Sequence, residues 1–212
     1  MLKNIIFDFG GVIINIDYHR IAKAFSLLGI KNFNEIFSQA AQSDLIDRLE
    51  LGAISPKDFR NEIRRLARQE LSDETIDRSM NAILLDLPAE RIELLQNLKK
   101  HYRLFLFSNT NKINYDCYYN SLKERYGFDL FKELFEKAYF SHETGMRKPD
   151  PDSFRFILND SRLLSSETLF IDDSQQHIAG AQQAGLQTIW LHDDMKINML
   201  FDEKYCLKQN YC

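Results

Sequence analysis

Five short runs of apolar residues, rich in β-branched and aromatic side chains, are the feature of this sequence that most limits its fold. Each run has the length and composition of a strand buried on both faces of a sheet. Helical patterns separate the last four runs, and strands that alternate with helices form a parallel sheet. The sequence therefore predicts an α/β protein with a doubly wound, mostly parallel sheet. The runs are Leu2–Phe7, Arg103–Phe107, Lys137–Phe140, Thr168–Ile171 and Gln187–Leu191.

The stretch from residue 18 to residue 88 is different, because it contains helix signatures but no convincing strand. An apolar stripe from Ile21 to Leu28 has helical spacing. Ser43, Ser55 and Ser72 stand where helix N-caps are expected, and the last of these helices is expected to run to about Leu85. Inserted between the first two strands, this block predicts a small helical cap over the sheet.

The expected division of the chain follows from this insertion. We assign residues 1–17 and 89–212 to an α/β core and residues 18–88 to the helical cap. Ligands of open α/β sheets bind outside the carboxyl ends of the strands, so the residues just after each strand are the first candidates for function. Residues 196–212 have no clear periodicity and are expected to pack as a terminal helix or to fray.

Composition limits the partners of the chain. Its 212 residues are 44% hydrophobic and 27% charged, which fits one sizeable globular unit or a core with an inserted cap. The net charge is −4 with acids and bases interspersed, so neither nucleic acid nor an anionic membrane is an expected partner. Cys117, Cys206 and Cys212 show no paired spacing, which favours a reducing compartment. The apolar run before Asp8 is too short for a signal peptide, and we expect a soluble cytoplasmic protein.

Polar residues follow four of the predicted strands. Asp8 comes directly after the first, residues 108–110 after the second, Lys148 after the third and Asp172 after the fourth. A carboxylate delivered from a buried strand into a glycine turn, as Asp8 is, is a candidate nucleophile. Attack on a phosphoryl group also needs a cation, a lysine and hydroxyl or amide donors to offset the negative charges. These positions together predict a site for phosphoryl chemistry.

Each member of this set has an expected role. The oxygens of Asp8 and Asp172 are hard ligands of the kind that Mg²⁺ prefers. The hydroxyl of Ser108 and the amide of Asn109 are expected to bind a phosphoryl oxygen, and Lys148 is expected to hold both the phosphate and Asp8. Ser108 and Thr110 are also acceptable caps for the helix that follows, so a purely structural interpretation stays open, most of all for Thr110.

Four motifs formed by these residues resemble those of the haloacid dehalogenase-like hydrolase superfamily, in the same order and across nearly the whole chain. The resemblance implies a Rossmann-like core, a cap inserted after the first motif, and an aspartyl intermediate on Asp8. It implies Mg²⁺ held by Asp8, the backbone carbonyl of Gly10 and Asp172, with Asp173 behind these ligands. The motifs are Asp8-Phe9-Gly10-Gly11-Val12, Leu106-Phe107-Ser108-Asn109, Arg147-Lys148-Pro149-Asp150 and Phe170-Ile171-Asp172-Asp173-Ser174.

Two positions depart from the pattern of the superfamily. Phosphatases of this kind usually have a second aspartate at the place of Gly10, which protonates the leaving alkoxide and later activates water, and such catalysis is worth about 10² to 10⁴ in rate. Asp17 and His19 are the nearest candidates to replace it. Sugar-phosphate phosphatases that resemble this chain also carry glycine there, so turnover is compatible with its loss. His177 stands where relatives often have asparagine, and we interpret it either as an orienting residue or as a plain helix residue.

We therefore expect a Mg²⁺-dependent phosphatase of a small phosphorylated metabolite, such as a sugar phosphate. A haloacid dehalogenase or another carbon-bond hydrolase is one alternative, but dehalogenases work without Mg²⁺, whereas Asp172 and Asp173 look like a metal site. A catalytically weak phosphometabolite-binding or regulatory protein is the other. Residues 51–53, in a turn of the predicted cap, are candidates to face the site, and the oligomeric state stays open. Tyr115, Tyr118, Tyr119 and Tyr126 have roughly helical spacing and are expected to pack rather than to stack on bases.

Overall fold

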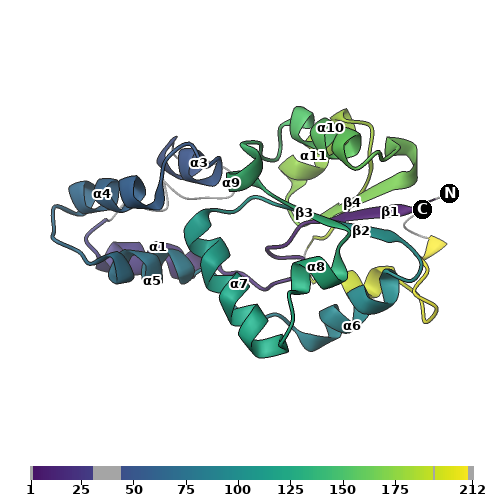
Figure 1. Ribbon diagram of the computed structural model, residues 1–212, viewed down its shortest axis with the longest axis horizontal. Helices are drawn as coiled ribbons and strands as arrows, with labels where there is room; N and C mark the ends of the chain where they lie inside the picture. Colours follow the sequence, from purple (N-terminus) through teal and green to yellow (C-terminus); the bar gives the residue numbers. More distant parts are fainter. Residues whose placement is uncertain (1, 31–43, 193, 210–212) are drawn as a thin grey trace.

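A five-stranded parallel sheet organises the computed structural model, which describes residues 2–30, 44–192 and 194–209 (Figure 1). The strand order is β3-β2-β1-β4-β5, and each neighbouring pair is parallel. The five predicted strands are confirmed and differ from the observed ones only at their ends. The predicted α/β class is confirmed as well. The strands are β1 (Asn4–Phe7), β2 (Arg103–Ser108), β3 (Lys137–Phe140), β4 (Thr168–Asp172) and β5 (Gln187–Trp190).

Both faces of the sheet are covered, because successive strand residues point to opposite sides and nearly all are apolar. On β1, for example, Ile5 and Phe7 belong to one hydrophobic cluster and Ile6 to another. Helices α10 and α11 cover one face, and α6, α7 and α8 cover the other (Figure 1). The bounds are α6 (Ala89–Leu98), α7 (Lys112–Tyr126), α8 (Leu130–Leu134), α10 (Pro151–Asp160) and α11 (Gln175–Gln183).

Four of the helices within the described ranges form a lobe beside the sheet, at the left of Figure 1, which we call the helical lobe. They are α1 (Tyr18–Leu27), α3 (Asp44–Glu50), α4 (Pro56–Ala67) and α5 (Asp73–Asn81). The lobe buries a hydrophobic cluster of its own, to which α7 contributes Ile113. The division of the chain into a core and a cap at residues 17 and 88 stays a prediction.

Local sequence signals explain where the lobe helices begin. Ser55 accepts a hydrogen bond from the main chain of Asp58, whose side chain bonds back, so the two form a capping box at the start of α4. Ser72 caps α5 in the same position. The predicted end of this last helix near residue 85 was wrong, because the chain leaves the helix after Asn81 and Leu84 pairs with Ile16 in an isolated bridge. The N-cap predicted at Ser43 lies outside the described residues.

The remaining short elements are α9 (Ser141–Thr144) and two 3₁₀ helices, Ser165–Glu167 and Ile197–Leu200. As far as residue 209, the tail forms no α-helix, and it is not frayed. Ile197, Leu200 and Phe201 are buried in the main core, and Phe201 pairs with Leu207. Within the described ranges, no helix combines the length and the apolar character needed to cross a membrane.

Candidate active site

Asp8 lies at the carboxyl end of the central strand, between β2 and β4. Its main-chain N–H donates to the carbonyl of Ile171 on β4 at 2.9 Å, so the sheet pairing continues up to this residue. The chain then turns, and Gly11 adopts a φ of +78°, which favours glycine. A Cβ atom at Gly11 would lie only 2.2 Å from Oδ2 of Asp173. The glycine turn therefore lets the carboxylate of another strand end approach the loop that carries Asp8.

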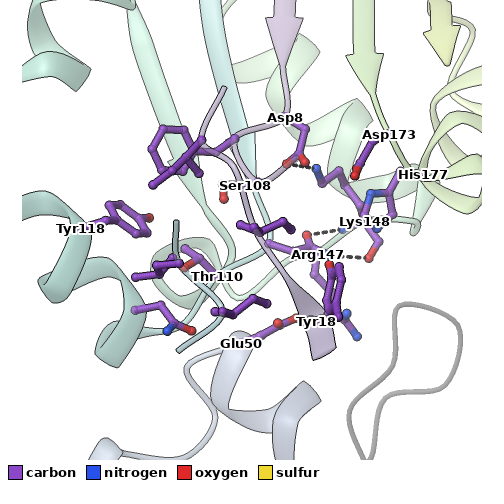
Figure 2. Close-up of a pocket in the computed structure, with 18 of the residues that line it drawn as sticks. Asp8, Tyr18, Glu50, Ser108, Thr110, Tyr118, Arg147, Lys148, Asp173 and His177 are labelled. Carbon is purple, nitrogen blue, oxygen red and sulfur yellow. Dashed lines mark hydrogen bonds and ion pairs between the residues drawn. The ribbon is translucent and has the colours of Figure 1, made fainter. Parts of the chain in front are cut away.

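The ammonium group of Lys148 lies between two carboxylates. Its Nζ is 2.6 Å from Oδ1 of Asp8 (Figure 2). It is also 2.8 Å from Oδ2 of Asp172, and the side chain is completely buried. The rings of Phe107 and Phe170 flank it, each with its centroid 5.4 Å from Nζ. Burial alone would lower the pKa of Lys148, but Asp172 and Asp8 hold that pKa above its ordinary value. Lys148 is thus a fixed positive charge at the carboxyl end of the sheet.

Three carboxylates meet at the same point, and their charge exceeds what Lys148 offsets. One oxygen each of Asp8, Asp172 and Asp173 lies within 4.8 Å of the other two. Burial, together with the charges of Asp8 and Asp172, raises the pKa of Asp173 to about 8. Burial also acts to raise the pKa of Asp172, but Lys148 and His177 hold it below its ordinary value. Carboxylate oxygens with surplus negative charge are a donor set that fits a hard divalent cation such as Mg²⁺.

Asp172 is held in place by its neighbours on α11. Nδ1 of His177 lies 3.0 Å from both carboxylate oxygens of Asp172, and the N–H of Ser174 donates to Oδ1 at 2.7 Å. His177 therefore lies beside the carboxylate cluster, in contact with one of its members. Gly10 lines the cavity in front of the cluster. The roles assigned to Gly10 and His177 stay predictions.

The three residues at and after the end of β2, residues 108–110, differ in what they contact. Ser108 is buried and lines the cavity. The side chain of Asn109 clamps the main chain of Lys148, because Nδ2 donates to the Lys148 carbonyl at 2.9 Å and Oδ1 accepts from its N–H at 3.0 Å. A phosphate-binding role for Asn109 therefore rests on its main-chain N–H. Thr110 does not cap α7, since Asn111 occupies the N-cap position and accepts from two main-chain N–H groups.

Gly10 has no side chain at the position where phosphatases of the resembling superfamily usually have a second aspartate. Asp17 is engaged as the N-cap of α1, with Oδ1 accepting from the N–H of His19 at 2.8 Å, and neither residue lines the cavity. Tyr18, which stands between them in the sequence, does line it (Figure 2). Burial and the surrounding carboxylates raise the pKa of Tyr18 far above its ordinary value, so its phenol stays protonated. On this side the cavity has a neutral phenol where Asp17 and His19 were expected.

The helical lobe reaches the site through α3. Arg147 lies 2.6 Å from Oδ1 of Asp47 and 3.1 Å from Oε2 of Glu50, and the Glu50 side chain is only 7% exposed. Gly52, just after α3, packs on the main chain of His142, because a Cβ atom there would lie 2.4 Å from the His142 carbonyl oxygen. The turn at residues 51–53 thus contacts the core, but the residues of this region that line the cavity are Asp47 and Glu50.

The cavity enclosed by these residues has a volume of about 270 Å³. Reasoning from the sequence missed Tyr18, Glu50 and Tyr118 as lining residues, and it gave Arg147 no role although that residue stands in the third motif. No periodicity or spacing marks these side chains, because their approach depends on how the lobe and α7 pack against the sheet. The further lining residues include Ile14, Ile16, Ile83, Leu84, Thr110, Asn114 and Gln176.

Two known proteins of related sequence are phosphatases by name. The D-ribitol-5-phosphate phosphatase of Bacteroides thetaiotaomicron is 32% identical over 190 residues, which cover 89% of this chain and 91% of the relative. The sesquiterpene phosphatase of Aspergillus oryzae is 25% identical over 195 residues, 91% of each chain.

A solved structure and a family model agree with these relatives. The structure is that of a mutant haloacid dehalogenase family enzyme from Bacteroides thetaiotaomicron, in complex with magnesium and inorganic phosphate. It has a TM-score of 0.90 and 32% identity, and the match covers 96% of this chain and all of that one. The model of the haloacid dehalogenase-like hydrolases matches residues 2–185. The sequence, the fold and the carboxylate cluster thus agree, and the chain belongs to the haloacid dehalogenase-like hydrolases.

Proposed function

We propose that this hydrolase is a Mg²⁺-dependent phosphatase that acts on a small phosphorylated metabolite, such as a sugar or sugar-alcohol phosphate, through an aspartyl phosphate on Asp8. The observation that carries this conclusion is the buried Lys148, 2.6 Å from Asp8 and 2.8 Å from Asp172, beside the third carboxylate of Asp173. A phosphate dianion brought to Asp8 needs positive charge on more than one side, and this arrangement supplies one cation and the ligands for another.

Asp8, Asp172 and the main-chain carbonyl of Gly10 are the groups that we propose for Mg²⁺, with Asp173 behind them. The cation, when bound, offsets the surplus negative charge and polarises the phosphoryl group. The magnesium and phosphate in the similar structure from Bacteroides thetaiotaomicron support this choice.

Each residue of the site has a proposed role in the reaction. A carboxylate oxygen of Asp8 forms a bond to phosphorus while the ester P–O bond breaks and the alcohol leaves, taking a proton. Lys148, Ser108 and the main-chain N–H of Asn109 hold the phosphoryl oxygens. Water next attacks phosphorus, releases inorganic phosphate and restores the Asp8 carboxylate. Gly10 cannot provide the proton, so the proton comes from another group or from solvent.

We also propose that residues 18–88 act as a cap over this site, on a core formed by residues 1–17 and 89–212. The ion pairs of Arg147 with Asp47 and Glu50 join the two parts at the edge of the cavity. A cap held in this way keeps bulk water from the site while the phosphoryl group is transferred to Asp8. The expected partner is the metabolite itself. The exposed free thiols of Cys117 and Cys206 support the cytoplasmic location expected from the sequence.

A second candidate is a protein that binds phosphometabolites without turning them over, and the glycine at position 10 is the observation that favours it. Metal-independent dehalogenation is less well supported, because the three clustered carboxylates fit a divalent cation that this reaction does not need. The three activities differ in what is released and in whether Mg²⁺ is needed.

The deciding experiment measures inorganic phosphate released from a panel of phosphate esters, with Mg²⁺ and with EDTA, by the natural chain and by Asp8→Asn. We expect release that requires Mg²⁺ and is abolished in Asp8→Asn. Asp116→Asn is the matched control, because Asp116 is exposed on α7 and pairs with Lys112. Phosphate binding without release from any ester would favour the binding protein, and halide release in EDTA would favour the dehalogenase.

A further inference from the structure

One wall of the cavity plays no part in the phosphate chemistry, and Tyr118 on α7 is its polar group. Figure 2 shows the Tyr118 hydroxyl pointing to the interior, from the side opposite His177 and Asp173. The side chain is only 4% exposed. Its ring centroid lies 4.9 Å from that of Phe9 and 5.9 Å from that of Phe131, so the predicted aromatic packing is confirmed and the hydroxyl is held in one place.

The Tyr118 hydroxyl is buried without a hydrogen-bond partner of normal geometry among the residues that the structure describes. The side chain of Thr110 can act as a hydrogen-bond partner of poor geometry and so lower its pKa, but burial outweighs this effect and raises the pKa well above its ordinary value. The group is therefore a neutral phenol that can donate and accept. On the same helix, the hydroxyl of Tyr119 donates to Oδ2 of Asp129 at 2.9 Å. Because a buried hydroxyl without a partner of normal geometry is unfavourable, a ligand in the cavity that supplies such a partner would be bound favourably.

The other groups on this wall limit what the ligand offers. The amide of Asn114 is already used, since Nδ2 donates to Met80 and Asn81 and Oδ1 accepts from Asn111. Ile83 and Leu84 are apolar, and they line the cavity as well. The remaining polar groups of this wall are the neutral hydroxyls of Tyr118 and Thr110, so it suits a neutral hydroxyl group rather than a charged one.

The lobe side of the cavity points to the same kind of ligand. Asp47 and Glu50 line this side of the cavity and pair with the guanidinium of Arg147. Carboxylates at this wall disfavour a second phosphate or a carboxylate close to them on the substrate, whereas hydroxyl groups can donate to them.

On the basis of the proposed phosphatase activity, we infer that Tyr118 binds a hydroxyl group on the alcohol part of the substrate and so selects phosphate esters of polyhydroxylated alcohols over those of apolar alcohols. The two classes are those named for the relatives above, ribitol phosphate and sesquiterpene phosphates. Tyr118 is thus a specificity-determining residue, positioned by its aromatic neighbours and separate from the carboxylate cluster.

The test compares hydroxylated esters with an apolar ester of similar size. Ribitol 5-phosphate, ribose 5-phosphate and glycerol 3-phosphate are assayed beside pentyl phosphate, which has five carbons and no hydroxyl group. Tyr118→Phe is expected to lower kcat/KM about 3- to 10-fold for the best hydroxylated ester, the loss of one neutral hydrogen bond, and to leave pentyl phosphate within about 2-fold. Equal changes for both kinds of ester, or a natural chain that prefers pentyl phosphate, would overturn the inference.

Tyr119→Phe is the matched control, because it removes a hydroxyl from the same helix outside the cavity. It is expected to leave the ratio between the two kinds of ester unchanged and to lower the unfolding midpoint slightly. Tyr118→Phe is expected to leave that midpoint unchanged or to raise it, since it removes a buried hydroxyl that has no internal hydrogen bond of normal geometry. A purely structural role for Tyr118 would give the reverse pattern.

Binding separates this inference from the proposed function. If the natural chain releases phosphate from no ester, the phosphatase proposal fails, and calorimetry with Mg²⁺ and the Asp8→Asn protein decides the role of Tyr118. Adding Tyr118→Phe to that protein is expected to weaken ribitol 5-phosphate binding about 3- to 10-fold and to leave pentyl phosphate binding unchanged. Identical losses for both ligands would rule out recognition of a hydroxyl group by Tyr118.

Discussion

Replacing Asn109 with leucine removes the clamp on Lys148. The two side-chain hydrogen bonds to the Lys148 main chain, 2.9 and 3.0 Å long, each contribute about 0.5–1.5 kcal/mol net. We therefore expect the free energy of unfolding to fall by about 1–3 kcal/mol, and Tm to fall by about 2–4 °C for each kcal/mol. Urea unfolding followed by circular dichroism measures the first quantity and a thermal scan the second.

The loss of activity is expected to be larger than the loss of stability explains. A protein of ordinary stability, about 5–15 kcal/mol, stays folded at 25 °C after such a change. However, Nζ of Lys148 must stay close to Asp8, where it now lies at 2.6 Å, and a displacement of about 1 Å costs about 100-fold in rate. We expect kcat to fall about 10- to 100-fold, measured at saturating substrate and Mg²⁺.

Asn109→Asp provides an electrostatic comparison. It keeps an acceptor for the Lys148 N–H but places a carboxylate oxygen against the Lys148 carbonyl, so one hydrogen bond is replaced by repulsion and both stability and kcat should fall below those of the natural chain. If Asn109→Leu unfolds at the same urea concentration as the natural chain and keeps its kcat, the side chain does not position Lys148 and the reasoning is wrong.

Three further substitutions test other contacts. Arg147→Met removes the cation beside the buried Glu50, so we expect the free energy of unfolding in urea to fall by about 1–3 kcal/mol and KM to rise. An unchanged urea midpoint would contradict this. Gly11→Ala forces a Cβ against the carboxylate of Asp173 and should lower both kcat and the free energy of unfolding. Gly127→Ala is the control for backbone strain alone, because Gly127 also has a positive φ but nothing lies within 4 Å of the added Cβ. Equal losses of stability in the two variants would exclude the steric cause. Burial lowers the pKa of His142 from 6.5 to about 4, so its neutral ring stabilises the fold fully above pH 6.5 and less as the pH falls towards 4. Between pH 7 and 5 the free energy of unfolding of the natural chain should fall by about 1 kcal/mol more than that of His142→Gln, a value already reduced because His142 is partly exposed. Parallel plots of unfolding free energy against pH for the two proteins would refute this.

The strand ends account for most of what the sequence could predict about the site. Asp8, Ser108 and Asp172 each stand at or just after the end of an apolar run, and a parallel sheet brings such residues to one edge whatever helices lie between them. Lys148 is a different case, because α9 and a loop separate it from β3. Its order after the third predicted strand and its place in the third motif predicted it, whereas periodicity alone would not.

Contacts between separately packed elements could not be predicted. The spacing of the tyrosines on α7 indicates a packed face, but it does not show which hydroxyl of that face meets a cavity, and Tyr118 was assigned to packing alone. The pairing of Arg147 with Glu50 depends on the orientation of the lobe, which no local pattern encodes. Asp17 was a candidate acid, yet it also stands directly before a helix, and in the structure the capping interaction prevails.

The origin of each cavity residue has a consequence for how such a protein changes over time. Asp8, Ser108, Lys148 and Asp172 are all carried by the sheet and its loops, whereas Glu50 belongs to the lobe. The residues proposed for the reaction are therefore carried by other elements than the lobe helices and α7, which supply the walls proposed for recognition. Substitutions in the lobe, or on the α7 face of the cavity, can give a descendant a new metabolite while the inherited reaction is left intact.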